Sequence, residues 1–77
     1  MKIGDKYRHF KHGTIYHIVE ITVDSENLES RASYVADKDI ENYGSCKQCV
    51  KPWSRPVKMF DDVVEFNGLK VKRFERL

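Results

Sequence analysis

The sequence has no long run of hydrophobic residues, only two cysteines and no glycine-rich loop. Without an apolar stretch of about 20 residues, no segment is expected to cross a bilayer. Two cysteines cannot form the disulfide framework that stabilises many small secreted domains. The glycine-rich motifs that cradle phosphates in nucleotide-binding enzymes are also missing. These absences exclude a membrane protein and a disulfide-stabilised scaffold, and they remove a common signature of phosphate-handling enzymes.

The residues that are present are typical of one small folded domain. The chain has 77 residues, of which 40% are hydrophobic and 12% aromatic, and this composition is too apolar for a disordered protein. We expect a single domain over residues 1–77 with a marginal core, because so short a chain buries only about 60% of its surface. Small proteins often compensate by self-association, so a homo-oligomer is expected.

The amino-terminal segment Met1–Asp5 lacks the apolar stretch of a signal peptide, which predicts a cytoplasmic protein with reduced thiols. Charge is unevenly distributed. Residues 1–23 carry +2 (four Lys or Arg, two acids), residues 24–43 carry −4 (two and six) and residues 44–77 carry +4 (eight and four). Basic ends and an acidic middle fit an anionic ligand held by both ends, or pairing between subunits. The total of +2 is too small for a bulk nucleic-acid binder.

Alternation of side chains predicts strands in the first half of the chain. Thr14–Val23 alternates and is rich in β-branched residues, as strands are. One face is expected to carry Ile15, His17, Val19, Ile21 and Val23, and the other Tyr16, Ile18, Glu20 and Thr22. Lys6–Phe10 is expected to form a shorter strand that turns at Lys11–Gly13. Arg31–Ala36 is expected to form a third strand.

The second half shows weaker patterns until its last hairpin. Residues 37–49 are expected to form an irregular loop insertion, with a helical turn near Asp39–Tyr43. Val50–Arg55 predicts a short strand, and Pro56–Phe60 a single helical turn that begins with proline. Asn67-Gly68 is a strong signal for a two-residue hairpin turn. Its register places Phe66 opposite Leu69, Val64 opposite Val71, Glu65 opposite Lys70 and Asp62 opposite Arg73.

These elements predict a mostly β fold. The two forms considered are a small SH3-like barrel and a strongly twisted antiparallel sheet, each of about five strands with one short helical turn. An open sheet closed by dimerisation is the alternative to a barrel closed within one chain.

Several motifs resemble the pattern of a bacterial and phage family known as domain of unknown function 1653. They are Tyr7-Arg8-His9-Phe10-Lys11, Ser25-Glu26, Trp53-x-Arg55-Pro56-x-x-Met59-Phe60 and the late Arg73-Phe74. The resemblance runs from Gly4 to Phe74. The chain departs from the pattern where His12 precedes Gly13, where 31–35 is more polar, and in the long 37–49 segment. The family carries no known activity, so the resemblance implies a shared fold and directs attention to two clusters.

The first cluster is Tyr7, Arg8, His9 and Lys11, at the predicted first strand. Arginine offers a planar fork of donors suited to phosphate or carboxylate, and tyrosine offers a stacking face. These residues are therefore candidates for ligand binding. The alternative is structural, with Tyr7 in the core and Arg8 paired with a carboxylate such as Asp61 or Asp62.

The second cluster is Trp53-Ser54-Arg55-Pro56. Pro56 favours an extended Arg55, which holds a guanidinium close to a large aromatic side chain. Such a pair binds nucleobases by stacking and phosphates by hydrogen bonds. The alternative is that Trp53 closes the core. Arg73 has a ready partner in Asp62, so a structural ion pair is expected there.

Cys46 and Cys49 have the spacing of half a zinc site. A complete site needs two more ligands, and the three histidines all precede the pair without a matching motif. We therefore expect no metal and no redox role, only two free thiols in a loop.

Together the two clusters predict a non-catalytic protein that binds a small anionic, nucleotide-derived ligand through Tyr7, Arg8, His9, Lys11, Trp53 and Arg55. No motif places a nucleophile beside a base, so no enzymatic activity, catalytic residue or cofactor is expected. The pocket is expected between subunits, because one small barrel has little concavity. Occurrence of the family in phages implies a sharper expectation, a phage-type protein that sequesters nucleotide signals of bacterial defence. The alternative is an SH3-like interaction module that binds nucleic acid or a protein partner.

Overall fold

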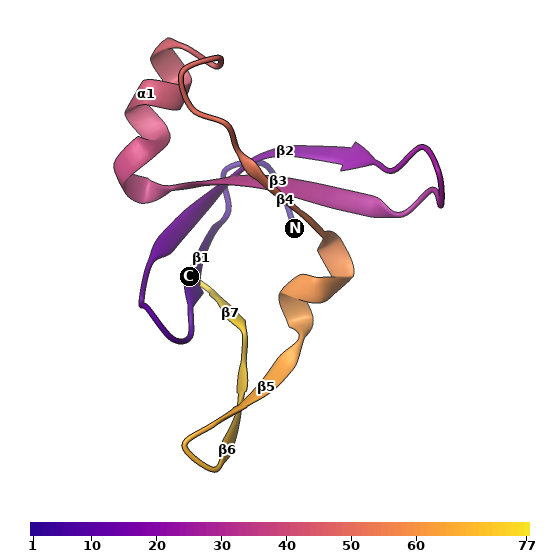
Figure 1. The fold of residues 1–77 in the computed structure, drawn as a ribbon, viewed down its shortest axis with the longest axis vertical. Coiled ribbons are helices and arrows are strands. Elements are labelled where there is room, and N and C mark those ends of the chain that lie inside the picture. The colour runs from indigo at the N-terminus through magenta and orange to yellow at the C-terminus, as the bar shows by residue number, and fades with distance from the viewer.

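A five-stranded antiparallel sheet forms the body of the protein, in the strand order β4-β3-β2-β1-β7 (Figure 1). The structure is a computed structural model that describes all residues 1–77. The elements are β1 (Lys6–His9), β2 (Ile15–Val23), β3 (Ser30–Ala36), the 3-10 helix η1 (Asp37–Asp39), α1 (Ile40–Ser45), β4 (Trp53–Pro56), the 3-10 helix η2 (Val57–Asp61), β5 (Val63–Phe66), β6 (Leu69–Lys72) and β7 (Phe74–Arg76). The prediction of a mostly β fold is confirmed. Of the two forms considered, the structure has the open sheet, whose edge strands β4 and β7 do not close into a barrel.

The hairpin of β5 and β6 is a separate two-stranded sheet that projects from the body (Figure 1). Its register pairs Phe66 with Leu69 and Val64 with Val71, as the sequence predicts. Asn67 and Gly68 have φ angles of 51° and 78°, which is the left-handed pair that a type I′ turn requires. The chain then bends at Arg73 and adds β7 beside β1, a strand that the sequence pattern did not indicate.

A β-bulge at Val19 divides β2 into two parts. Before the bulge Ile18 lies opposite Tyr34, and after it Ile21 lies opposite Ala32. Tyr34 and Ala32 are both buried on the core side of β3, so Ile18 and Ile21 share a face. The prediction that one uninterrupted alternation would place His17 and Ile21 together was wrong. The extra residue reverses the alternation halfway along the strand.

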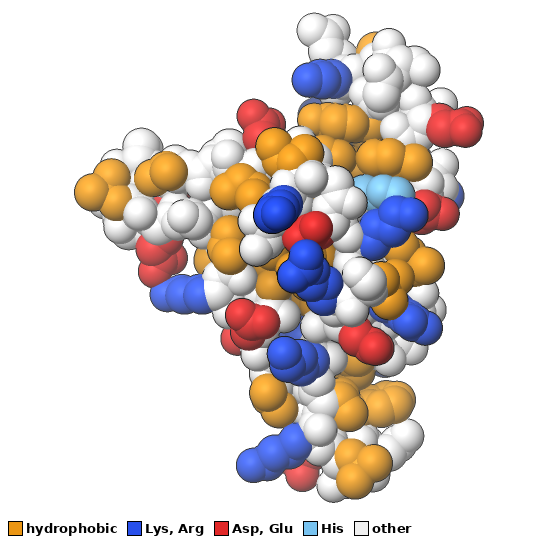
Figure 2. Space-filling model, turned by 180° about the vertical axis from the view of Figure 1, so that it is seen from behind, with side chains coloured by type: hydrophobic (Ala, Val, Ile, Leu, Met, Phe, Trp, Pro, Cys, Tyr) orange, Lys and Arg blue, Asp and Glu red, His pale blue; other side chains and the backbone are white.

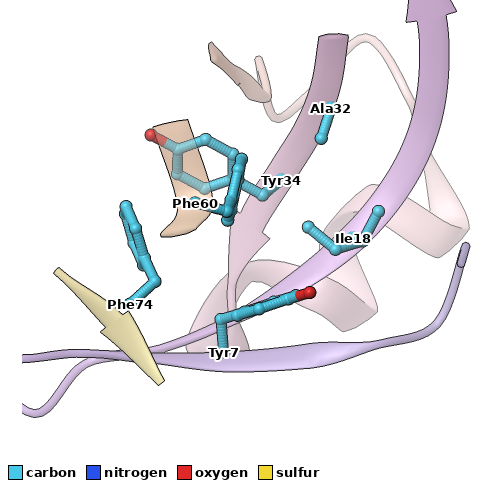
Figure 3. Packing of buried hydrophobic residues seen from close by; sticks show 6 residues of the cluster. All are labelled: Tyr7, Ile18, Ala32, Tyr34, Phe60 and Phe74. Atoms are coloured by element: carbon cyan, nitrogen blue, oxygen red, sulfur yellow. The ribbon is translucent and has the colours of Figure 1, made fainter. Parts of the chain in front are cut away.

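The core is small and mostly aromatic. Six side chains from β1, β2, β3, η2 and β7 point toward one another: Tyr7, Ile18, Ala32, Tyr34, Phe60 and Phe74 (Figure 3). Phe60 is the centre, with its ring centroid 4.9 Å from Phe74, 5.2 Å from Tyr7 and 5.6 Å from Tyr34. Only eight of the 77 residues are buried, and the molecule is 17 Å across its shortest axis. Stability therefore depends on a few rings, and η2 is the predicted helical turn that supplies the central one.

Residues 37–45 are helical, so the prediction of an irregular loop over 37–49 was wrong for its larger part. The predicted turn near Asp39–Tyr43 lies within η1 and α1. Ile40 and Tyr43 are spaced three residues apart and are both half-buried, which gives α1 one apolar side. Val35 of β3, outside the aromatic core cluster, is buried at 2% exposure. Val35 is therefore a buried position that the aromatic cluster does not account for.

Cys46 and Cys49 form a disulfide directly after α1. The amide of Cys49 donates to the carbonyl of Cys46, and this turn brings the two Cα atoms to 5.3 Å. That separation lies in the range a disulfide needs. The expectation of two free thiols was wrong, because the tight turn favours pairing more than the bare spacing indicates.

Reduction of this disulfide is expected to lower the free energy of unfolding by no more than about 2 kcal/mol, because the bond joins residues only three positions apart. Urea unfolding with and without a reductant measures the change. The double variant Cys46→Ser, Cys49→Ser should match the reduced protein. A loss of about 4 kcal/mol or more would contradict the prediction.

Large hydrophobic side chains remain on the surface. Figure 2 shows them at the tip of the arm formed by β2 and β3 and on the β5–β6 hairpin. They are Ile3, Ile21, Val23, Leu28, Trp53, Val63, Phe66, Leu69 and Leu77. No helix is long and apolar enough to span a membrane.

Candidate functional site

The open seam between the edge strands β4 and β7 brings two arginines together. Arg55 lies opposite Ala32 of the core, so its side chain lies on the core face of β4. Its guanidinium carbon is 5.5 Å from the centre of the Phe74 ring, a cation–π contact. Arg73 directly precedes Phe74, at the start of β7. Phe74 therefore has the Arg55 guanidinium over its ring and Arg73 as its neighbour in the sequence, and both arginines lie close enough to His9 to influence its titration.

Both arginines have a buried nitrogen that makes no hydrogen bond. Nε of Arg55 and Nε of Arg73 are shielded from solvent and unpartnered. The four ion pairs of the structure involve His17, Arg31, Lys58 and Arg76, and neither seam arginine is among them. Buried polar groups are paired in most proteins, and exceptions gather at functional sites. Each of the two arginines therefore has one Nε–H donor that no acceptor within the chain satisfies.

His9 lies near Arg55 and Arg73, and their positive charges act on its imidazole ring. Burial lowers the pKa of His9, and the nearby His12, Arg73, Arg55 and Lys11 lower that pKa further. Each of these charge effects comes from a cation. Nδ1 of His9 accepts a hydrogen bond from the Lys11 amide at 3.2 Å, so the neutral ring carries its proton on Nε2. The Nε2–H of the neutral ring is then available as a hydrogen-bond donor.

Several aromatic rings surround Phe74, next to Arg55 and His9. The Phe74 centroid lies 5.3 Å from His9, 6.0 Å from Tyr34 and 6.1 Å from Tyr16. Trp53 lies opposite Tyr34 on β4 and is 67% exposed. We call His9, Arg55, Arg73 and Phe74 the arginine seam. A ligand with a negative group and a planar ring could bind the donors and stack on an exposed ring nearby.

The structure separates the residues that the sequence put forward. His9 and Arg55 meet at the arginine seam. Tyr7 lies in the core, where burial and the carboxylate of Asp5 raise the pKa of its phenol, so its ring offers no face to a ligand. Trp53 is exposed and does not close the core. Of the two remaining residues, Arg8 is exposed opposite Glu75 of β7, and Lys11 is exposed beside His9.

Sequence reasoning missed Arg73, which it assigned to an ion pair with Asp62. The Arg73 amide donates to the Asp62 carbonyl at 2.8 Å, but the two side chains form no ion pair. The backbone register was right and the side-chain partnership was wrong. The signal that could have identified Arg73 is the Arg-Phe pair of the family pattern, since both of its members belong to the seam.

The low pKa of His9 predicts a pH dependence of stability. The unfolded chain binds the proton at about pH 6.5, whereas the folded chain binds it only at lower pH. Stability is therefore expected to fall as the pH drops through about 6.5 toward the folded pKa, because the unfolded state takes up more protons. Urea unfolding at pH 7.5 and 5.5 measures this loss. His9→Gln should lose less stability over the same interval, and an equal loss in both proteins would contradict the assignment.

A model of one protein family, described as "Protein of unknown function (DUF1653)", matches residues 5–76. The match covers almost the whole chain and confirms the family resemblance seen in the motifs. Neither a curated protein nor a solved structure matches the sequence. No three His, Cys, Asp or Glu side chains come together in a way that could hold a metal ion.

Proposed function

The chain belongs to the DUF1653 family, and from the geometry of the arginine seam we propose that it binds a small anionic, nucleotide-derived ligand without catalysing a reaction. The observation that carries the proposal is the pair of buried, unpartnered Nε atoms of Arg55 and Arg73. Both side chains are close enough to His9 to lower its pKa. Phosphate oxygens are strong acceptors for arginine donors, so a phosphate is the kind of group that these side chains suit.

The nucleotide part of the proposal depends on the aromatic surface. Tyr16 is half-buried and packs edge-on against Tyr34, with centroids 5.2 Å apart. Trp53 exposes two thirds of its surface on the neighbouring strand. Base–aromatic stacking contributes about 1–3 kcal/mol per base in nucleic-acid-binding proteins. A ligand that combines a phosphate with a base uses both features, whereas a simple anion uses one.

A ligand panel tests the proposal. The purified protein is heated with pyrophosphate, AMP, ADP, GDP, UDP, ADP-ribose and a cyclic nucleotide, each at millimolar concentration. A compound at about 100 times its Kd should stabilise the fold by about 2.7 kcal/mol. At least one nucleotide should raise the unfolding temperature more than pyrophosphate does. No shift across the whole panel would refute the proposal.

The second candidate is an interaction module for nucleic acid, which the basic carboxyl-terminal third supports with eight Lys or Arg against four acids over 44–77. Polyanion binding falls steeply as salt rises, because it releases counterions from the backbone. Measuring the affinity for a single-stranded oligonucleotide at low and at physiological salt distinguishes nucleic-acid binding from binding of a small ligand. Saturation at one small molecule per site, with weak salt dependence, supports the lead proposal.

In the lead proposal the protein sequesters its ligand in the cytoplasm, as a phage protein directed against nucleotide defence signals would. Sequestration and turnover are distinguished by prolonged incubation followed by chromatography of the nucleotide. Recovery of the unchanged compound supports sequestration. Stoichiometric recovery of a new product would show an enzyme instead.

We also propose that the protein self-associates through the β5–β6 hairpin. A two-stranded hairpin is marginally stable alone, and this one exposes Val63 at 59% and Leu69 at 68%. A second copy of the hairpin has the same open edges and can pair with it antiparallel. Light scattering should give a dimer for the native protein and a monomer for Val63→Lys, Leu69→Lys. A native monomer would contradict this proposal without affecting the ligand site.

A further inference from the structure

A pocket of about 480 Å³ lies between the end of β1 and the β5–β6 hairpin. Small-molecule sites typically have volumes of about 300–1,000 Å³, so a nucleoside-sized group fits here. The pocket is lined by Arg8, His9, Phe10, Gly13, Phe66, Val71, Lys72 and Glu75. The pocket shares His9 with the arginine seam, but neither Arg55 nor Arg73 lines it.

The lining suits a flat, weakly polar group. Phe10 contributes a ring from the body, and Phe66 and Val71 contribute apolar surface from the hairpin. The Phe10 and Phe66 rings meet edge to face at 5.5 Å, which sets one apolar wall. Around this wall lie two cations, Arg8 and Lys72, and one acceptor, Glu75. This combination provides stacking, donors for a phosphate and an acceptor for an exocyclic amine.

His9 connects the pocket to the arginine seam. Its ring centroid is 4.9 Å from Phe10, a pocket residue, and 5.3 Å from Phe74, a seam residue. The His9 ring therefore packs against a ring of the pocket and against the ring of the arginine seam. A ligand whose phosphates occupy the seam can extend a second ring-bearing group past His9 into the pocket.

We propose that the pocket is the second subsite of the ligand site and that the ligand is a dinucleotide, with two nucleosides joined through phosphates. The inference rests on the proposed function and specifies its ligand class. The phosphates bind Arg55 and Arg73, one base stacks beside Trp53 or Tyr16, and the other base enters the pocket against Phe66. The hairpin is therefore part of the binding site.

Matched probes test the inference by calorimetry. ADP and diadenosine diphosphate share one adenosine and the pyrophosphate, and only the second carries another adenosine. GDP and diguanosine diphosphate form a second pair. One added stacked base should strengthen binding about tenfold or more, although the dinucleotide has lower charge. Phe66→Ala should remove that gain and leave the affinity for the mononucleotide unchanged.

Two further variants keep the outcome interpretable. Phe66→Leu preserves apolar volume in the hairpin but removes the ring, so it should lose most of the gain while retaining the native circular dichroism spectrum. Val23→Ala changes an exposed apolar residue of β2 outside the pocket and should keep the gain in full. Mononucleotide binding with no gain from the second nucleoside would overturn the inference alone. Equal loss of both affinities in Phe66→Leu would also overturn it. Absence of binding by every probe would overturn the proposed function.

Discussion

Arg55→Gln is expected to weaken nucleotide binding about 10- to 100-fold, because a charged hydrogen bond contributes about 1.5–3 kcal/mol. The same variant should change the stability of the unliganded protein by less than about 1 kcal/mol. Arg55 has no carboxylate partner, its buried Nε makes no bond, and its one specific contact is the face of Phe74. A large loss of affinity with little loss of stability distinguishes a ligand-binding arginine from a structural one. Calorimetry and urea unfolding of the same sample measure both.

Arg73→Gln should behave in the same way, and Arg31→Gln provides the matched control. Arg31 donates from Nε to Ser54 at 3.0 Å and lies 3.8 Å from a carboxylate oxygen of Asp24. It precedes Ala32 on β3, so its side chain lies on the opposite face from the core. Arg31→Gln should retain full affinity. If all three variants bind equally well, the arginine seam is not the site.

Phe60→Ala is expected to lower the free energy of unfolding by about 3–5 kcal/mol. Phe60 is 2% exposed and contacts the rings of Tyr7, Tyr34 and Phe74. Small domains have total stabilities of about 5–15 kcal/mol, so this substitution alone removes much of the fold. The effect should be larger here than in a thicker protein, because few other buried side chains can compensate. Chemical unfolding monitored by the fluorescence of Trp53 measures it.

Leu69→Ala is the control for Phe60→Ala. Leu69 is 68% exposed, so its truncation should change the unfolding free energy by less than about 0.5 kcal/mol in the monomer. Dilute protein keeps self-association out of this comparison. A loss below about 1 kcal/mol for Phe60→Ala would mean that the aromatic cluster is not the core in solution.

The sequence predicted those elements whose local residue pattern is compatible with only one kind of secondary structure. The strand over Thr14–Val23 and the hairpin at Asn67-Gly68 follow from β-branched alternation and from two left-handed positions. The bulge at Val19 could not be predicted, because a valine suits either face of a strand and the reversal depends on pairing with β3. A helical turn near Asp39–Tyr43 was predicted, but the full extent of η1 and α1 was not, for a similar reason. The apolar side of α1 consists of few residues, so the sequence pattern alone gives only a weak helix signal.

The sequence identified the part of the candidate site that lies in local motifs and missed the part that depends on the three-dimensional fold. Arg55 and His9 belong to motifs with clear chemistry, and the fold brings them together. Tyr7 belongs to the same motif, but strand register decides which side chains enter the core, and Tyr7 lies on that face. Arg73 was misassigned because Asp62 lies opposite it in the extended hairpin register. Side-chain direction at the end of a ladder depends on the bend into β7, which no local pattern indicates.

Of the only two prolines of the chain, Pro52 directly precedes the edge strand β4 and Pro56 is its last residue. Proline has no amide hydrogen to offer, and edge strands that are short and bounded by proline are poor templates for the addition of another strand. The outer edge of β4 is therefore a poor site for the addition of a strand from another molecule, and aggregation through this edge is disfavoured.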